Sequence, residues 1–355
     1  MKNHFLILSL YSIAFSSVFA DHPTLSLEDG SPGPITTMGS ACVNQFIFFD
    51  ALSDAEILRY SGSEDVVRST DRVISSSLNT AYGVSDDFTL GFSLPYIWRT
   101  NIREASGNHH GGEEDGGHHD EKTPKHGGED HGNANGGEDA APTVESVGDS
   151  HGIGDATLYA QYRFLHDEAN DRQVSLITGL KMSTGRTDVL TNSGLLLEAH
   201  HQPGSGSWDP LLGLAFTQGL GRWSFDANAL YAFVTEGSQE SNLGDIFSYN
   251  AAVSYRVLGT HDEDVPHQEG LAHEHPTTLD LILEANGEWR GQVVEGSDAD
   301  GNTGGNIVFL SGGTRLAWGH SWAATLSLGT PVLEDLNGIQ SEPVMRMLFR
   351  VSKAF

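Results

Sequence analysis

The chain has 355 residues and a formal net charge of -29, with 48 acidic against 19 basic residues. This balance excludes nucleic acid as a partner, because phosphate contacts need lysine and arginine. Cys42 is the single cysteine, so an internal disulfide cannot stabilise the fold.

The first 20 residues carry the features of an export signal. Lys2 supplies a positive start, residues 5–18 are mostly apolar, and Ala20 ends a small-residue cleavage site. The apolar run is too short and wrongly flanked for a membrane-spanning helix. We therefore predict a cleaved signal peptide over 1–20 and an exported mature chain. Residues 21–35 are expected either to plug the following domain or to form a periplasmic tether.

From residue 36 to residue 355, apolar and polar residues alternate in segments of about ten residues. In TLDLILEANGEW (278–289), Leu281 and Leu283 fall on one face, and Asp280 and Glu284 fall on the other. Aromatic residues gather near the ends of the apolar faces, as they do at the two interfaces of a membrane barrel. We therefore predict an all-β fold, a transmembrane antiparallel β-barrel of about 12 strands of the outer-membrane type. The expected strands lie near 37–50, 68–83, 88–102, 153–165, 173–185, 208–218, 222–236, 244–258, 278–292, 306–318, 321–333 and 343–355.

The connections between these segments alternate between short and long, as in outer-membrane barrels with short periplasmic turns and longer outer loops. The long ones are 51–67, 103–152, 186–207, 237–243, 293–305 and 334–342. The connection 259–277 breaks the rule, because it is long and parity places it on the periplasmic side. Phe355, which closes an amphipathic strand, resembles the signal read by the barrel-assembly machinery. We expect a protein of the bacterial outer membrane, in contact with its lipid.

Five segments carry a resemblance to a known family. They are SHGIGDATLYAQYRF (150–164), KMSTGRTDV (181–189), QPGSGSWDPLLGLA (202–215), GRWSFDANALYAF (221–233) and GDIFSYNAAVSYR (244–256). The chain resembles the outer-membrane transporter family named for the MetA pathway of phenol degradation, over about residues 36–355. The resemblance implies an outer-membrane channel for small solutes, with small aromatic or hydrophobic compounds as the substrate class.

The alternation predicts a set of charged side chains on the inner face of the barrel. We expect Glu284 and Glu288 to lie between Arg256 and Arg315 on the two neighbouring strands, where opposite charges pair. The set is interpreted either as a structural ladder or as a constriction that selects solutes by charge. Its members are Asp226, Arg256, Asp280, Glu284, Glu288, Arg290, Arg315, Arg346 and Arg350.

Histidine is concentrated in two of the long connections, among 17 histidines in all. Imidazole next to carboxylate suits Zn(II), Cu(II) or Ni(II), although glycine-rich spacers give no fixed frame. The two tracts are expected at opposite mouths of the barrel, either as metal collectors or as charged insertions with incidental affinity. The candidate ligands are His109, His110, His118, His119, His126 and His131 in the outer loop 103–152, and His261, His267, His273 and His275 in the periplasmic loop 259–277.

The sequence predicts transport rather than catalysis. Serine, aspartate and histidine are scattered, and no spacing selects a nucleophile and its base. No cofactor is required, and a divalent metal ion is the candidate bound species. Three functions remain open: a channel for small organic solutes, a barrel for divalent metal uptake, efflux or buffering, and a non-conducting structural barrel.

Overall fold

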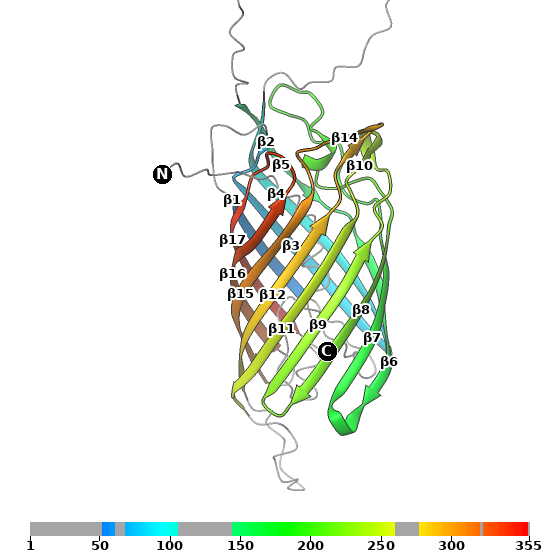
Figure 1. Ribbon diagram of the computed structural model, residues 1–355, viewed down its shortest axis with the longest axis vertical. Coiled ribbons are helices and arrows are strands. Elements are labelled where there is room, and N and C mark those ends of the chain that lie inside the picture. The colour runs from blue at the N-terminus through cyan, green and yellow to red at the C-terminus, as the bar shows by residue number, and fades with distance from the viewer. Residues whose placement is uncertain (1–51, 61–67, 106–143, 260–276, 320–321, 354–355) are drawn as a thin grey trace, which may run out of the picture.

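The computed structural model describes residues 52–60, 68–105, 144–259, 277–319 and 322–353. Within these residues the chain forms a tall barrel of tilted antiparallel strands (Figure 1). The wall consists of twelve long strands, which are β1 (Leu52–Tyr60), β3 (Arg72–Ser85), β4 (Phe88–Ala105), β6 (Thr157–Asp167), β7 (Arg172–Lys181), β8 (Asp209–Leu220), β9 (Trp223–Ala232), β11 (Ile246–Leu258), β12 (Thr278–Arg290), β15 (Gly305–Trp318), β16 (Trp322–Leu336) and β17 (Pro343–Lys353).

The wall closes on itself. The first strand, β1, pairs with both β3 and the last strand, β17, and the ring is completed where β4 pairs with β6. Each wall strand thus has two antiparallel neighbours. Closure leaves no free strand edge, which is how a sheet satisfies its backbone polar groups inside lipid.

The side chains of the wall confirm the predicted alternation. On β6, Tyr162 and Phe164 are exposed on the outer face, whereas Thr157 and Gln161 are buried on the inner face. Apolar residues thus face outward and polar residues face inward, the reverse of a water-soluble domain and the pattern of a lipid-embedded barrel. This arrangement confirms the predicted fold class.

Aromatic side chains mark both ends of the outer face. Trp318 stacks on Trp322 with ring centroids 6.3 Å apart at one end. Tyr231 and Phe247 lie 6.3 Å apart at the other end. These pairs occupy the levels expected for aromatic girdles at the two membrane interfaces.

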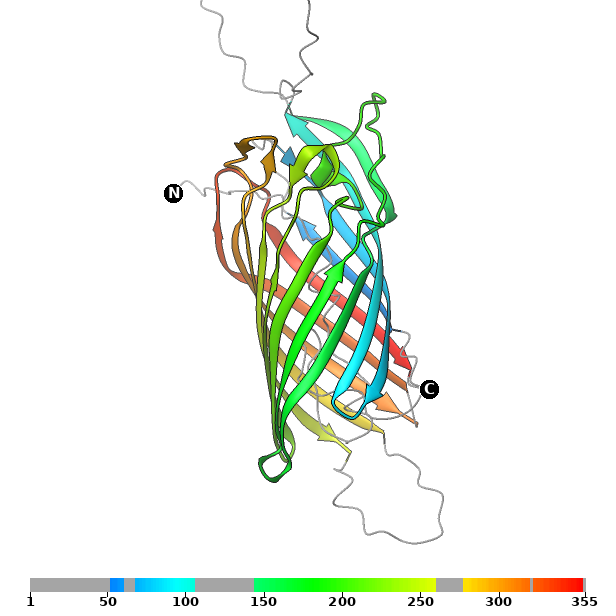
Figure 2. The same ribbon diagram turned by 90° about the vertical axis from the view of Figure 1, so that its right-hand side faces the viewer.

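The two ends of the barrel differ in their connections, as Figures 1 and 2 show. The end that is lower in Figure 1 carries the tight turns, such as Asp86-Asp87 between β3 and β4 and the 3-10 turn Glu168–Asn170 between β6 and β7. β11 ends and β12 begins at this end as well. The connection 259–277, expected on the periplasmic side, lies almost entirely outside the described residues. In the part of the chain described, helices long and apolar enough to span a membrane are absent.

The opposite end carries the long connections, which contain short elements of their own. The strands β10 (Ser241–Asn242), β13 (Val294–Glu295) and β14 (Asp298–Ala299) form a small antiparallel sheet there. The 3-10 turn η3 (Ser238–Glu240) precedes β10. The loops after β9 and β12 are thus joined to each other at the long-loop end.

Two sequence predictions of strand position were wrong. The connection expected over 51–67 contains β1, and the expected strand 37–50 lies outside the described residues. The alternation in LSDAEILRY was obscured because Asp54 and Glu56 occupy the same parity as the apolar Leu52 and Leu58. The outer loop expected over 103–152 is shorter than predicted, because β4 continues to Ala105 and β5 (Val144–Ile153) pairs with it.

Candidate functional site

A row of charged residues crosses the inner wall near the short-turn end. Antiparallel register places Arg256 (β11) beside Asp280 (β12), Asp280 beside Arg315 (β15), Arg315 beside Thr325 (β16) and Thr325 beside Arg350 (β17). All five residues are on the inner face and buried. We call these residues the arginine row.

One pair in the arginine row forms two hydrogen bonds. Arg256 Nε donates to Asp280 Oδ1 at 2.8 Å, and Arg256 Nη2 donates to Asp280 Oδ2 at 3.1 Å. This bidentate geometry fixes both side chains against the wall. The predicted pairing of Arg256 with Glu284 is thereby corrected to Asp280, the residue directly opposite Arg256. Glu288 instead accepts a hydrogen bond from Arg290, two residues along the same strand, at 2.8 Å.

A second inner row lies closer to the long-loop end. Register links Arg346 through Gly329 and Ser311 to Glu284, and then through Ala252 to Asp226 on β9. Small residues separate the charged ones here. Asp226 accepts hydrogen bonds from Thr217 Oγ1 at 2.7 Å and Ser224 Oγ at 2.8 Å, so its carboxylate is held by hydroxyl groups.

An asparagine ladder crosses three strands next to the second row. Asn250 Nδ2 donates to Asn228 Oδ1 at 2.8 Å, and Asn286 Nδ2 donates to Asn250 Oδ1 at 3.0 Å. The residues stand directly opposite one another on β9, β11 and β12. Neutral amides thus lie next to the two charged rows, on the side of the long-loop end.

The interior has the opposite charge bias to the chain as a whole. Among the described residues, eight basic side chains are buried: Arg99, Arg163, Lys181, Arg256, Arg290, Arg315, Arg346 and Arg350. The buried acidic side chains are five: Asp155, Asp209, Asp226, Asp280 and Glu284. The formal charge of the full chain is -29, whereas basic residues outnumber acidic ones among the buried charged side chains of the described part.

The connection between β7 and β8 folds into the barrel. It was expected over 186–207 as an ordinary outer loop, but Leu197, Ala199 and Gln202 are almost fully buried within the ring of strands. Arg99, on the inner face of β4, donates from Nη1 to the carbonyl oxygen of Gln202 at 3.0 Å. We call residues 182–208 the lumen loop.

A single glutamine holds the two arms of the lumen loop together. Gln202 Oε1 accepts from the backbone N–H of Val189 at 2.9 Å, while its Nε2 donates to the carbonyl oxygens of Val189 at 3.0 Å and Leu197 at 2.6 Å. Gln239 from η3 also donates to the Leu197 carbonyl at 3.1 Å. The loop is therefore an ordered part of the interior, fixed by backbone contacts on both sides.

The lumen loop is attached to the wall at Lys181, the last residue of β7. Lys181 Nζ lies 2.7 Å from Asp209 Oδ2 and 3.1 Å from Asp155 Oδ2. It also donates to Ser207 Oγ at 3.1 Å and to Ser205 Oγ. One buried cation thus joins β7, the start of β8 and the end of the lumen loop. Charge burial of this kind is stable only when every partner is present.

Two glycines permit the arms of the lumen loop to cross. A Cβ atom added to Gly204 would lie 2.5 Å from the backbone of Gly185, and one added to Gly185 would lie 2.5 Å from Gly204 Cα. Both clashes involve backbone, which cannot rotate away. Gly185 and Gly204 therefore permit a close approach of the two backbone segments.

We expect Gly204→Ala to loosen the lumen loop and to cost about 1–3 kcal/mol, the usual range for overpacking a filled site. Trypsin cleavage after Arg186, which lies on the exposed side of this loop, would measure the opening. The matched control is Gly301→Ala, because an added Cβ there meets no atom within 4 Å. Equal cleavage rates in the two variants would contradict the role assigned to Gly204.

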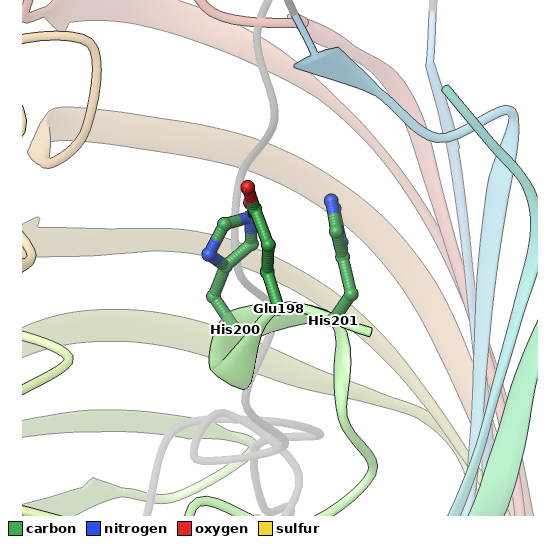
Figure 3. Close-up of side chains that lie close together, drawn as sticks. All are labelled: Glu198, His200 and His201. Atoms are coloured by element: carbon green, nitrogen blue, oxygen red, sulfur yellow. Dashed lines mark ion pairs between the residues drawn. The ribbon is translucent and has the colours of Figure 1, made fainter. Parts of the chain in front are cut away.

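The lumen loop carries a cluster of three potential metal ligands. Glu198, His200 and His201 each offer one ligand atom, and these atoms all lie within 4.8 Å of one another. His200 and His201 belong to the 3-10 turn η2 (Ala199–His201). Figure 3 shows the three side chains standing close together on this turn, enclosed by the wall strands.

Burial keeps His200 neutral. Its Nε2 lies 3.0 Å from Glu198 Oε2. Desolvation lowers the pKa of His200 to about 3, and the carboxylate of Asp300 acts in the opposite direction without reversing the shift. The imidazole is therefore uncharged at neutral pH, the form in which histidine binds metals.

Sequence reasoning did not bring these three residues together. His200 and His201 stand outside the two histidine-rich tracts, and their significance depends on the inward path of the lumen loop. The spacing Glu198-Ala199-His200-His201 next to buried apolar residues was the only available signal. The ten histidines predicted as metal ligands, in 109–131 and 261–275, lie outside the described residues.

The sequence model of the family described as "Putative MetA-pathway of phenol degradation" matches residues 61–332. The chain belongs to this family. The match confirms the resemblance noted in the sequence. Among proteins with curated descriptions, none matches the chain.

Solved structures with the same architecture include several outer-membrane proteins. An outer membrane channel from Pseudomonas putida F1 has a TM-score of 0.51 and 15% sequence identity, covering 89% of this chain and 98% of its own. The NanC porin has a TM-score of 0.41 and 8% identity, covering 85% of this chain and 100% of its own. LpxR from Salmonella typhimurium has a TM-score of 0.39 and 8% identity, covering 86% and 100%. The first of these likenesses supports the fold assignment. A closed antiparallel barrel with an apolar outer face is the outer-membrane type, which assigns this family member to the bacterial outer membrane.

Proposed function

We propose that this barrel is a channel for small organic solutes, and that its inner wall favours solutes with negative charge. Aromatic compounds are the proposed substrate class, in keeping with the phenol-degradation description of the family. Arginine suits such solutes because its guanidinium group pairs with carboxylates and also stacks on aromatic rings. The proposal rests on one observation, which is the arginine row on the inner face.

The composition of the arginine row supports a role beyond wall stability. Its described side chains include three arginines and one aspartate, and the backbone register places a second aspartate, Asp54 of β1, opposite Arg350. A row that served only as a ladder would need equal numbers of opposite charges. The excess of positive charge lies where a solute passes between the two mouths, and charged rings at such places set selectivity in pores.

The arginine side chains of this row are almost fully buried. Arg256 is 1% exposed, and Arg315 and Arg350 are each 2% exposed. A twelve-stranded barrel is intermediate between filled eight-stranded barrels and wide porins, so a narrow pore that opens intermittently is the expected behaviour. We therefore expect conduction to expose these buried guanidinium groups to the path of the solute.

The test is single-channel recording of the purified full chain in a planar bilayer, with unequal KCl on the two sides. We expect small, intermittent conductance steps and a reversal potential displaced toward the chloride equilibrium value. Benzoate added to one side should reduce the chloride current, because it competes for the same arginines. Absence of any conductance would overturn the proposal in favour of a structural barrel. A preference for potassium would overturn the charge selectivity.

A second candidate function is divalent metal handling by the two histidine-rich tracts, with Zn(II), Cu(II) or Ni(II) as the ion. What favours it is the position of the neighbouring strands: β4 ends at the long-loop end, whereas β11 ends at the short-turn end. The tracts thus start from opposite mouths. Deleting both tracts should change the metal sensitivity of the cells, and unchanged sensitivity would count against this function.

The proposal has two further parts. The protein transports solutes rather than catalysing a reaction, and the barrel-assembly machinery delivers it to the membrane by recognising Phe355. The first is supported by the absence of a nucleophile spacing in the sequence. The second is supported by β17, the strand that joins β1 to close the barrel. Replacing Phe355 by Ala should lower the amount of folded barrel in the membrane, and an unchanged amount would remove this part of the proposal.

A further inference from the structure

Three potential metal ligands lie close together inside the barrel. They are not part of the arginine row on which the proposed channel function rests. Glu198, His200 and His201 lie within one turn of the lumen loop, and their candidate ligand atoms are all within 4.8 Å of one another. Both histidines are at most 2% exposed. Their rings lie 4.2 Å apart between centroids and are tilted by 57°, so the two imidazoles stand side by side without stacking flat.

The ligand set is that of a transition-metal site. Two imidazoles and one carboxylate form a combination found at zinc sites that keep a fourth position for water or substrate. Hard cations such as Ca²⁺ and Mg²⁺ prefer oxygen ligands throughout, so this cluster does not suit them. Asp300, from the loop between β14 and β15, acts electrostatically on His200, and its carboxylate adds negative charge next to the cluster.

The backbone that carries the ligands is held in place. Arg99 on β4 donates to the carbonyl oxygens of Gln202, at 3.0 Å, and His201, at 3.4 Å. On the other side, Gln202 Nε2 donates to the carbonyl oxygen of Leu197 at 2.6 Å and fixes the backbone there. A site on a fixed turn loses little conformational entropy when the ion binds, which is the condition for tight binding. The glycine-rich histidine tracts offer no such frame in their sequence.

We propose that Glu198, His200 and His201 bind one divalent transition-metal ion, of the Zn(II), Co(II), Ni(II) or Cu(II) type, inside the barrel. The ion joins three side chains of the lumen loop and stabilises its inward position. The three protein ligands leave a coordination position for water or for an oxygen atom of a solute. This site is independent of the proposed channel function, and either can fail without the other.

The experiment uses the purified full chain, stripped with a chelator and titrated with Zn(II) in the presence of a competing indicator. The double variant His200→Ala/His201→Ala should lose one tight equivalent of zinc relative to the wild type. Glu198→Gln should keep that equivalent and weaken it by at least about ten-fold, since changes around a metal usually cost that much. The matched control is His166→Ala, an exposed histidine at the short-turn end, which should leave binding unchanged.

A second readout separates this site from the histidine-rich tracts. Zinc bound at the cluster should slow trypsin cleavage after Arg186 in the wild type, and it should have no effect on cleavage in the double variant. A difference in gel mobility between heated and unheated samples verifies that each variant is a folded barrel. The proposal is overturned if the folded double variant binds the same number of tight zinc equivalents as the wild type. It is also overturned if zinc protects Arg186 equally in both proteins.

Discussion

Replacing Lys181 by methionine is expected to detach the lumen loop from the wall and to destabilise the folded barrel by about 3–5 kcal/mol. Methionine has a similar length, and it removes the positive charge together with the hydrogen bonds to Ser205 and Ser207. Asp155 and Asp209 would then face each other as buried carboxylates, at 5% and 0% side-chain exposure, without the ammonium group that lies 3.1 Å and 2.7 Å from them. Leaving a buried charge without its partner costs far more than an exposed pair contributes.

Urea unfolding in detergent, followed by tryptophan fluorescence, measures this loss. The double variant Lys181→Met/Asp155→Asn should recover part of the stability, because it removes one of the two uncompensated charges. Lys353→Met is the matched control: Lys353 lies 5.2 Å from the ring centroid of Trp322 at the short-turn end and should change stability by about 1 kcal/mol or less. If Lys181→Met unfolds at the same urea concentration as the wild type, Lys181 does not anchor the loop.

Charge reversal in the arginine row is expected to invert the ion preference of the channel. A unit charge about 8 Å from the path of an ion, at an effective dielectric constant near 20, contributes about 2 kcal/mol. Reversing one arginine changes the local charge by two units. The variant Arg315→Glu should therefore shift the chloride-to-potassium permeability ratio by at least about ten-fold, from anion preference to cation preference.

The reversal potential under a KCl gradient is the measurement for this variant. Arg315→Gln removes the charge without reversing it, and it should give an intermediate ratio if electrostatics sets the preference. Arg222→Gln is the control, because Arg222 lies in the turn before β9 and donates to the carbonyl oxygen of Arg256 from outside the row, at 3.3 Å. Equal permeability ratios in wild type and Arg315→Glu would show that the row is only a structural ladder.

The wall of the barrel could be predicted because its pattern is local. In a strand the side-chain period is two, so the faces of residues such as Leu281 and Asp280 follow from sequence alone, and the structure confirms them. The inner positions of all nine residues predicted to line the lumen follow from the same rule. The hydrogen-bond partners of these residues cannot be predicted from this rule. The register between strands decides whether Arg256 lies opposite Asp280 or Glu284.

The lumen loop could not be predicted, because its path depends on contacts far apart in the sequence. Arg99 and Gln202 are 103 residues apart, and Asp155 and Ser205 are 50 apart. Glycine and polar residues in 182–208 are typical of any surface connection. For the same reason Glu198 and His200 could not be recognised as members of a buried cluster. β1 was missed because Asp54 and Glu56 interrupt the apolar positions of its sequence.

The seam between β1 and β17 bears on how the protein reaches its folded state. Ser53 is opposite Val351 across this seam, so the ring needs residues from both ends of the described chain before its last pair of strands can form. Contacts between residues this distant in sequence form slowly, and strand edges that are still unpaired are prone to aggregation. Without β17, the strands β1 and β16 each keep an unpaired edge, so the ring cannot close from the N-terminal strands alone. Closure of the wall therefore depends on the last strand in the sequence.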